Sequence, residues 1–301
     1  MSFSARAVQG FIHHMVRAHH FPAAQLVALF HQARPLAGVL SMIHHPYEAL
    51  PWRSYRRLFV NPEKIRNGQA WLLAHAHAIR QEERRFGVPG AIIAAILGVE
   101  TDYGRVTGQI PALDSLSTLA FEDPGRGAFF RHELSGYLRL CRREHFNPTA
   151  IRGSYAGALG IPQFMPTAYL RYAIGRSPGR RANLFASMDD AINSVARYLL
   201  AKGWQPGQPV AIEVALAPDR PPPPPGLIET PTHVRALRRA GFLIPHRLSN
   251  QLTVELVTRP GLASTHYWLT LHNFQSLMAY NPSVNYTMAV FELALRLSEP
   301  S

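Results

Sequence analysis

The stretch Val88-Pro-Gly-Ala-Ile-Ile-Ala-Ala-Ile-Leu-Gly-Val-Glu-Thr-Asp-Tyr-Gly104 is an aliphatic run that ends in acidic residues. A run of this kind behind a proline predicts a helix that begins near Pro89. Residues three, four, seven and eight positions apart share one face of an α-helix. Glu100 therefore continues a face that carries four aliphatic residues: Ile92, Ile93, Ile96 and Leu97.

Glu100 is the residue of chemical interest in this run. An ionised carboxylate on an apolar helix face is costly to remove from water, so the pKa of Glu100 is expected to rise. A carboxylic acid that keeps its proton near neutral pH beside a cleft can serve as a general acid. The pattern alone leaves a second interpretation open, a helix-end glutamate that reaches solvent.

The composition bounds the size and the partners of the protein. The chain has 301 residues, 47% of them hydrophobic, which is enough for one large domain or two smaller ones. Its net charge of +12 comes almost wholly from arginine, since Lys64 and Lys202 are the only lysines. A basic surface favours an anionic partner, although genome composition explains arginine richness equally well. We predict no nucleic-acid binding, because no basic region with heptads and no Cys/His finger spacing occurs.

Compartment and membrane signals are sparse. Cys141 is the only cysteine, so no disulfide within the chain is possible, and it is expected to be a small core residue. The longest apolar run, residues 88–99, is too short to span a bilayer. The N-terminus, Met1–Gly10, lacks the apolar core of a signal peptide and an early lipid-attachment cysteine.

Hydrophobic periodicity predicts mostly helices, followed by a short stretch of strands. Helices are expected as a pair within 3–34 and then at 62–86, 112–121, 127–144, Asp189–Leu200 and Tyr286–Leu297. A proline-containing loop is expected near Pro46 and Pro51. Alternation of apolar and polar residues predicts strands at Val210–Leu216, Leu252–Val257 and Thr265–Leu271. Pro221–Pro225 is expected to be an extended linker.

A second segment, Gly153-Ser-Tyr-Ala-Gly-Ala-Leu-Gly-Ile-Pro-Gln-Phe-Met-Pro166, is rich in glycine and proline. That composition argues against a regular helix throughout and allows backbone to approach a ligand closely. Ser154 and Gln163 can both donate and accept hydrogen bonds toward a sugar.

Together these segments resemble a known family, the membrane-bound lytic transglycosylase B family, whose members cleave bacterial peptidoglycan. The similarity runs nearly from end to end and is carried by five segments: Trp52–Arg57, Gly98–Gly104, Ser154–Pro166, Asp190–Tyr198 and Asn273–Tyr286. It implies a mainly α (α+β) fold, with a lysozyme-like helical catalytic domain and a small antiparallel β-containing subdomain. We expect the helical catalytic region at 1–206, the β-containing subdomain at 207–271 and a segment returning to the catalytic cleft at 272–301.

The resemblance also assigns roles to single residues. Glu100 would be the sole catalytic acid/base, Ser154 would orient the substrate N-acetyl group, and Gln163 would line the saccharide subsites. Six further residues would belong to the substrate cleft: Tyr55, Arg126, Tyr198, Tyr280, Asn281 and Tyr286. Gly125 stands where the family often has the first arginine of a pair, so one of its contacts to peptide or glycan is in doubt.

Family members often carry a calcium loop after the second motif, and this chain departs from that pattern. Its segment Ile174–Asn183 has arginines and glycines where calcium needs oxygen ligands, so we predict no calcium here. The histidines do not show a known metal-ligand spacing either. We therefore expect neither a metal nor a cofactor.

One carboxylate in a convincing context is what a lytic transglycosylase requires, whereas most glycosidases use two. Asp102 would point to another side of the helix, and Asp114 is more easily explained as structural. The resemblance implies cleavage of the β-1,4 bond between N-acetylmuramic acid and N-acetylglucosamine, with 1,6-anhydromuramic acid as the product. It further implies a monomer on glycan strands in the periplasm, and it leaves an outer-membrane anchor open. A hydrolysing muramidase and a non-catalytic peptidoglycan-binding protein remain the alternatives.

Overall fold

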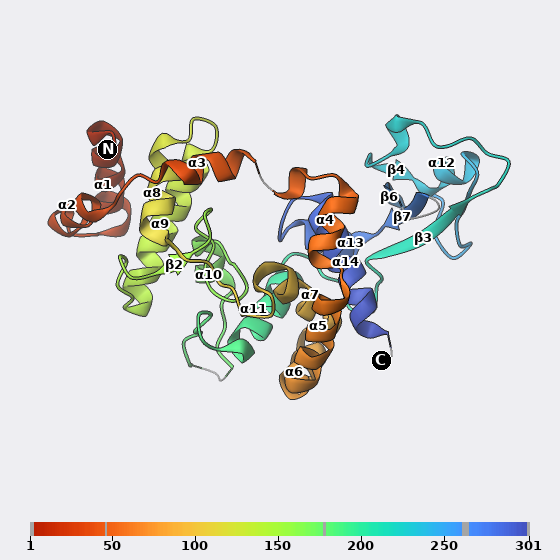
Figure 1. Cartoon of the computed structure of the whole chain (residues 1–301), viewed down its shortest axis with the longest axis horizontal. Helices are drawn as coiled ribbons and strands as arrows, with labels where there is room; N and C mark the ends of the chain where they lie inside the picture. Colours follow the sequence, from red (N-terminus) through yellow and green to blue (C-terminus); the bar gives the residue numbers. More distant parts are fainter. Residues whose placement is uncertain (1–2, 46, 177–178, 261–264, 300–301) are drawn as a thin grey trace.

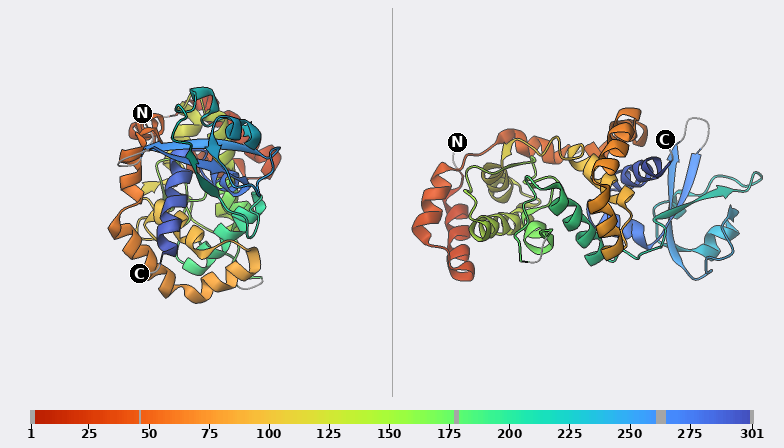
Figure 2. Two further views of the ribbon diagram at one scale, coloured as in Figure 1. Left: turned by 90° about the vertical axis from the view of Figure 1, so that its right-hand side faces the viewer. Right: turned by 90° about the horizontal axis from the view of Figure 1, so that it is seen from below.

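Helices make up most of the molecule, and one five-stranded sheet lies at one end of its long axis (Figure 1). The computed structural model describes residues 3–45, 47–176, 179–260 and 265–299. Seen from below, the order along the axis is the same, with the N-terminal helices at the opposite end from the sheet (Figure 2). The predicted class, mainly helical with a small antiparallel sheet, is confirmed.

The end that carries the N-terminus is a helical cluster. An edge-to-face group of Phe11, Phe30 and Phe121, with centroids 5.7 and 5.9 Å apart, holds its helices together. The cluster contains five helices: α1 (Ala5–His19), α2 (Ala23–Gln32), α3 (Ala37–His44), α8 (Ala112–Glu122) and α9 (Gly127–Glu144).

The middle of the molecule is built around α7 (Gly90–Thr101). This helix is buried on nearly all sides and not along one stripe, which is typical of a helix that is apolar all round. Its neighbours include the C-terminal helix, which brings residues from the end of the chain against Glu100 (Figure 1). The helices that contact α7 are α5 (Pro62–Ala74), α6 (Ala76–Phe86), α11 (Met188–Ala201) and α14 (Val284–Ser298). Around them, α4 (Trp52–Phe59) and α13 (His272–Met278) pack on α14, and α10 (Pro166–Tyr172) packs on α9 and α11.

One local prediction was wrong, and another is confirmed in a shorter form. The single helix expected over 62–86 is two helices, α5 and α6, which break at His75 with φ −108° and ψ 15°. The break allows α5 to pack on α7 and α14 while α6 packs on α11. The loop expected around Pro51 is short, because Pro51 caps the start of α4 and a 3-10 turn, η1 (Tyr47–Ala49), precedes it. Pro46 lies outside the described residues.

The sheet is antiparallel, with the strand order β4-β6-β7-β3-β5. Its strands are β3 (Ala211–Leu216), β4 (Thr232–His233), β5 (Phe242–Leu243), β6 (Thr253–Pro260) and β7 (Thr265–Thr270). The connections between the strands include the 3-10 turn η2 (Pro225–Leu227) and the helix α12 (Val234–Arg239). A hydrophobic core of its own includes Val214, Leu237 and Leu256. The main core runs through the other helices, α14 included. The division at 206/207 and 271/272 stays a prediction, which this distribution of cores supports.

Candidate active site

Glu100 lies on the last turn of α7, and several contacts fix that end of the helix. Asp102 ends it in the left-handed conformation, with φ 50°. Lys64 of α5 donates from Nζ to the Gly98 carbonyl and to Asp102, both at 2.9 Å. A cation at this position also complements the helix dipole. The Thr101 hydroxyl donates to the Ile161 carbonyl at 2.8 Å and so ties Glu100's helix to the second sequence segment.

A two-stranded ladder carries that second segment to the site. β1 (Ile110–Pro111) follows the α7 end, and β2 (Arg152–Gly153) pairs with it directly before Ser154. As predicted, the segment from Ser154 to Pro166 is not a regular helix; it is a chain of turns closed by a bridge between Leu159 and Phe164.

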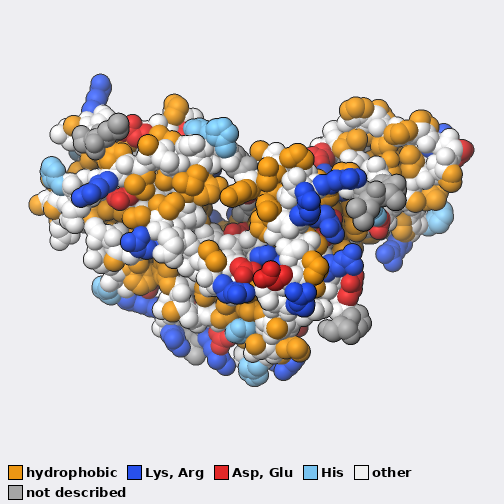
Figure 3. All heavy atoms as spheres, in the orientation of Figure 1, with side chains coloured by type: hydrophobic (Ala, Val, Ile, Leu, Met, Phe, Trp, Pro, Cys, Tyr) orange, Lys and Arg blue, Asp and Glu red, His pale blue; other side chains and the backbone are white. Residues whose placement is uncertain are grey.

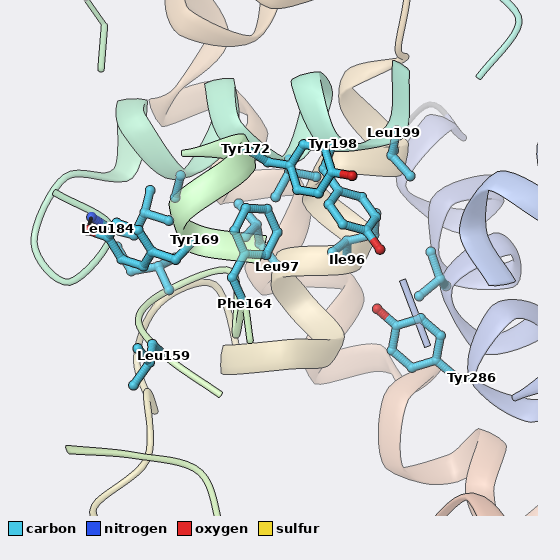
Figure 4. Packing of buried hydrophobic residues seen from close by; sticks show 14 of the residues in the cluster. Ile96, Leu97, Leu159, Phe164, Tyr169, Tyr172, Leu184, Tyr198, Leu199 and Tyr286 are labelled. Atoms are coloured by element: carbon cyan, nitrogen blue, oxygen red, sulfur yellow. Dashed lines mark hydrogen bonds between the residues drawn. The ribbon is translucent and has the colours of Figure 1, made fainter. Parts of the chain in front are cut away.

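Glu100 is held by one strong hydrogen bond. The Tyr286 hydroxyl, on a side chain that is 2% exposed, donates to Glu100 Oε1 at 2.6 Å. Figure 4 shows the Tyr286 ring approaching from α14, on the other side of Ile96 from the Tyr198 ring. Burial raises the pKa of Glu100 to about 7, and the charge of Glu48 adds to the rise, while the Tyr286 hydrogen bond opposes it. Near neutral pH the group exists in both protonation states.

Ser154 and Gln163 use part of their hydrogen-bonding capacity within the protein. Ser154 Oγ accepts from the backbone amides of Ala156 and Ala158 at 3.2 and 3.1 Å, which leaves its O–H free to donate. Gln163 donates from Nε2 to the carbonyls of Thr107 and Gly160 at 3.1 and 2.7 Å. Its Oε1 thereby remains as an acceptor. Ser154 can therefore bind a carbonyl oxygen of a ligand, and Gln163 a donor.

The structure brings three of the four predicted tyrosines, Tyr198, Tyr280 and Tyr286, into one aromatic group. Tyr280 and Tyr286 stack with centroids 6.4 Å apart, and Tyr198 meets Tyr280 edge-on at 5.0 Å. The Tyr280 hydroxyl donates to the Pro162 carbonyl and the Tyr198 hydroxyl to the Ala279 carbonyl. These two hydroxyls therefore support the walls of the site, whereas Tyr286 reaches Glu100 itself.

Two of the remaining predicted residues come from different elements. Tyr55 of α4 is 1% exposed; burial raises its pKa, and the charges of Glu48 and Glu100 add to the rise. Arg126 is exposed at the start of α9, over the rings of Phe129 and Phe130 at 5.3 and 5.0 Å. Its charge lowers the pKa of Tyr155, although burial and acidic or phenolic neighbours raise that pKa overall.

Asn281 contacts Glu48, a residue that was not predicted from the sequence. Its Nδ2 donates to Glu48 Oε1 at 2.9 Å, and Asn285 Nδ2 donates to the Glu48 carbonyl at 3.2 Å. Glu48 lies on η1, far from Glu100 in sequence and in a segment without marked periodicity. The only available signal was an acidic residue four positions before Trp52, which begins the Trp52–Arg57 segment.

The surface is hollowed between the part that carries α3 and the part that carries α4, and acidic atoms are visible inside the hollow (Figure 3). Two further cavities lie away from Glu100, one of about 710 Å³ between α2 and the end of α9 and one of about 890 Å³ between α1 and α9. The central hollow is therefore the candidate active site.

Around the described part of the segment Ile174–Asn183, the acidic side chains already have partners. The two carboxylate oxygens of Asp190 accept from the backbone amides of Arg176 and Asn183, both at 2.9 Å, and Asp189 pairs with Arg176 at 2.7 Å. These carboxylates are thus already engaged by donors of the loop itself. Ser177 and Pro178 lie outside the described residues, and within the described ones no group of three or more potential ligand side chains could hold a metal.

Comparison with known proteins identifies the family of this chain. The family model described as Transglycosylase SLT domain matches residues 4–295. The chain belongs to this family. It is 35% identical to the membrane-bound lytic murein transglycosylase B of Escherichia coli over 295 residues, which cover 95% of the chain and 81% of that protein.

Solved structures in the family agree with the fold. The soluble lytic transglycosylase SltB1 of Pseudomonas aeruginosa, in a catenated form, is 33% identical with a TM-score of 0.90 over 98% of both chains. SltB3 of the same organism, in complex with NAG-NAM-pentapeptide, is 28% identical with a TM-score of 0.83 over 98% of this chain and 79% of its own.

The family membership confirms the resemblance found in the sequence, including the lysozyme-like helical region and the enzymatic class. The roles of individual site residues stay predictions. Among the described residues, no single helix is long and apolar enough to cross a bilayer; one pair of helices, bent by 84°, meets the length and composition requirements only when taken together.

Proposed function

We propose that the chain is a lytic transglycosylase that cleaves the β-1,4 bond between N-acetylmuramic acid and N-acetylglucosamine in peptidoglycan. The observation that carries this proposal is the state of Glu100: a partly buried carboxyl group that accepts a hydrogen bond from the Tyr286 hydroxyl at 2.6 Å, with its pKa raised to about 7. Such a group can give up and take back a proton within one reaction at neutral pH.

The mechanism assigns both proton transfers to Glu100. In the first step protonated Glu100 donates to the glycosidic oxygen while the substrate N-acetyl carbonyl oxygen attacks the anomeric carbon. The bond from the anomeric carbon to the glycosidic oxygen breaks, and the N-acetylglucosamine side leaves with a free hydroxyl. Ser154, with its hydroxyl free to donate, orients that carbonyl. In the second step the Glu100 carboxylate takes the proton of the C6 hydroxyl, and the C6 oxygen bonds to the anomeric carbon. This displaces the N-acetyl oxygen and restores the N-acetyl group. The product is 1,6-anhydromuramic acid, Glu100 regains its proton, and no water is consumed.

Two carboxylates considered from the sequence, Asp102 and Asp114, support a one-acid mechanism because each is already engaged; a third, Glu48, accepts from Asn281 at 2.9 Å. Asp102 pairs with Lys64 at 2.9 Å and Arg105 at 3.4 Å. Asp114 accepts from the Arg34 backbone amide at 3.0 Å. A hydrolase would need a second carboxylate that is free to act on water or on the sugar.

The substrate and the compartment follow from the same proposal. We assign glycan strands to the central hollow, with Tyr55, Tyr280 and Asn281 on its walls and Arg126 near the entrance for anionic groups of the stem peptides. The protein would act as a monomer in the periplasm, where its substrate lies. A net charge of +12 favours association with the carboxylates of peptidoglycan.

Mass spectrometry of digested sacculi tests the proposal. Anhydromuramic ends are expected, and reducing muramic ends would refute it in favour of a muramidase. Glu100→Gln should reduce cleavage by at least about a thousand-fold while sacculus binding stays close to wild type. If the wild-type protein binds sacculi without cleaving them, the alternative of a non-catalytic binding protein holds.

A further inference from the structure

A second carboxylate, that of Glu48, lies at the proposed site and takes part in none of the steps above. It comes from η1, the connection that runs between the N-terminal helical cluster and α4. Two amide side chains from the C-terminal part of the chain reach it. Asn281 donates to its Oε1 at 2.9 Å, and Asn285 donates to the backbone carbonyls of Glu48 and Leu50 at 3.2 and 3.1 Å.

This geometry determines the orientation of the Asn281 amide. An ionised carboxylate only accepts hydrogen bonds, so Nδ2 of Asn281 must face Glu48. The Oδ1 atom of Asn281 then faces away from Glu48 and is available to a donor on a bound sugar. Without an acceptor-only neighbour, the two ends of an asparagine amide are nearly interchangeable.

Glu48 also acts on Glu100 through its charge. The groups that bear on the pKa of Glu100 are burial, the Tyr286 hydroxyl and the Glu48 carboxylate. In turn, Glu100 contributes to the raised pKa of Tyr55 and of Tyr280.

Several charged groups on α5, α6 and α14, which pack against α7, have partners of their own; Glu292 of α14 pairs with Arg56 of α4 at 2.6 Å. Lys64 of α5 forms an ion pair with Asp102, which also pairs with Arg105. On α6, Glu83 binds the Gly90 amide at 2.6 Å, at the opposite end of α7 from Glu100. Within the described residues, Glu48 is thus the one charged group that bears on the pKa of Glu100.

We propose that Glu48 is a positioning residue of the cleavage site, which fixes the Asn281 amide for the substrate and adds a second negative charge beside Glu100. The inference rests on the proposed function. Glu48 neither donates to the glycosidic oxygen nor attacks the sugar; it acts through Asn281 and through Glu100.

The test compares Glu48→Gln, Glu48→Ala and Asn285→Ala in the full chain, with sacculi as substrate. Removing the like charge lowers the pKa of Glu100, so its proton is lost at lower pH. The alkaline limb of kcat/KM should therefore move down by on the order of half a pH unit in both Glu48 variants. Glu48→Ala should in addition raise KM several-fold, because Asn281 loses its partner. Asn285→Ala loosens the η1 backbone and leaves the charge in place, so its limb should match wild type.

Product analysis separates the ways in which the inference can fail. Anhydro products with an unmoved limb in Glu48→Gln would overturn this inference and leave the proposed function standing. The inference would also be overturned if the alkaline limb of kcat/KM moved by the same amount in Asn285→Ala. The shift would then come from a loosened η1 backbone and not from the charge of Glu48. Reducing ends from the wild-type enzyme, with activity lost in Glu48→Gln, would make Glu48 a second catalytic carboxylate and refute the proposed function as well.

Discussion

The Tyr286 hydroxyl donates to Glu100 Oε1 across 2.6 Å and joins the last helix of the chain to the proposed proton donor. A hydrogen bond to a carboxylate favours its charged form, so this bond limits the rise in the pKa of Glu100 that burial causes. The Tyr286 hydrogen bond therefore keeps the pKa of Glu100 in a range that suits both of its proposed roles, first as proton donor and then as proton acceptor.

Tyr286→Phe removes that bond and keeps the ring. The pKa of Glu100 should rise further, by roughly one to two units, because a hydrogen bond to a charged group contributes about 1.5–3 kcal/mol. The alkaline limb of the pH profile of kcat/KM should move up accordingly, while kcat falls because the carboxylate form is less stable. Tyr280→Phe is the matched control, since its hydroxyl binds the Pro162 carbonyl. An unmoved limb in Tyr286→Phe would show that the hydroxyl does not tune Glu100.

Glu100→Gln should change stability in a pH-dependent way. Burial raises the pKa of Glu100 from 4.5 to about 7 in the folded protein. Between these values the unfolded chain has released a proton that the folded protein keeps, so the free energy of unfolding falls as the pH rises through this window. Glutamine carries no titrating proton and avoids the fall. Urea denaturation should find the variant equal to wild type near about pH 4 and more stable by up to about 3 kcal/mol near about pH 8. An equal difference at both pH values would contradict the assigned burial.

Two glycines on helices should respond to alanine in opposite directions. A Cβ at Gly98 of α7 would lie 2.7 Å from the Tyr103 ring, whose hydroxyl is anchored to the Lys64 carbonyl at 2.8 Å. Gly98→Ala should therefore destabilise the protein by about 1–3 kcal/mol. At Gly10 of α1 an added Cβ would meet nothing within 4 Å, so Gly10→Ala should stabilise by about 0.5–1 kcal/mol. Equilibrium unfolding of the two variants measures both changes in the free energy of unfolding. A stabilising Gly98→Ala would mean that the Tyr103 ring moves to make room for the added methyl group.

The loop before α11 should be independent of calcium. Millimolar calcium chloride or a chelator should leave the Tm unchanged, whereas a bound ion at a hundred times its Kd would stabilise by about 2.7 kcal/mol. Asp190→Ala should lower the free energy of unfolding by about 2 kcal/mol or more, because two backbone amides lose their acceptor. Asp189→Asn, at an exposed pair with Arg176, should cost less than about 1 kcal/mol. A calcium-dependent Tm would refute the metal-free assignment.

Sequence patterns predicted best the elements whose signals are local. The α7 helix and the start of α11 were both placed, and Ser187 caps α11 by accepting from the Asp190 amide at 3.2 Å. The break at His75 was missed because neither proline nor glycine marks it; both helices contact α7, but α5 also packs on α14 and α6 on α11. Tertiary contacts of this kind cannot be predicted from the neighbouring residues in the sequence.

By itself, the sequence determined that an acid ends an apolar helix, that a glycine-rich segment follows, and which family the chain resembles, because these depend on neighbouring residues. Only the tertiary structure decided which groups surround that acid. Tyr286 lies 186 positions from Glu100, and Asn281 lies 233 positions from Glu48. Chain folding brings these groups within hydrogen-bond distance, and the resulting desolvation and charge set the proton affinity of Glu100, which no local pattern encodes.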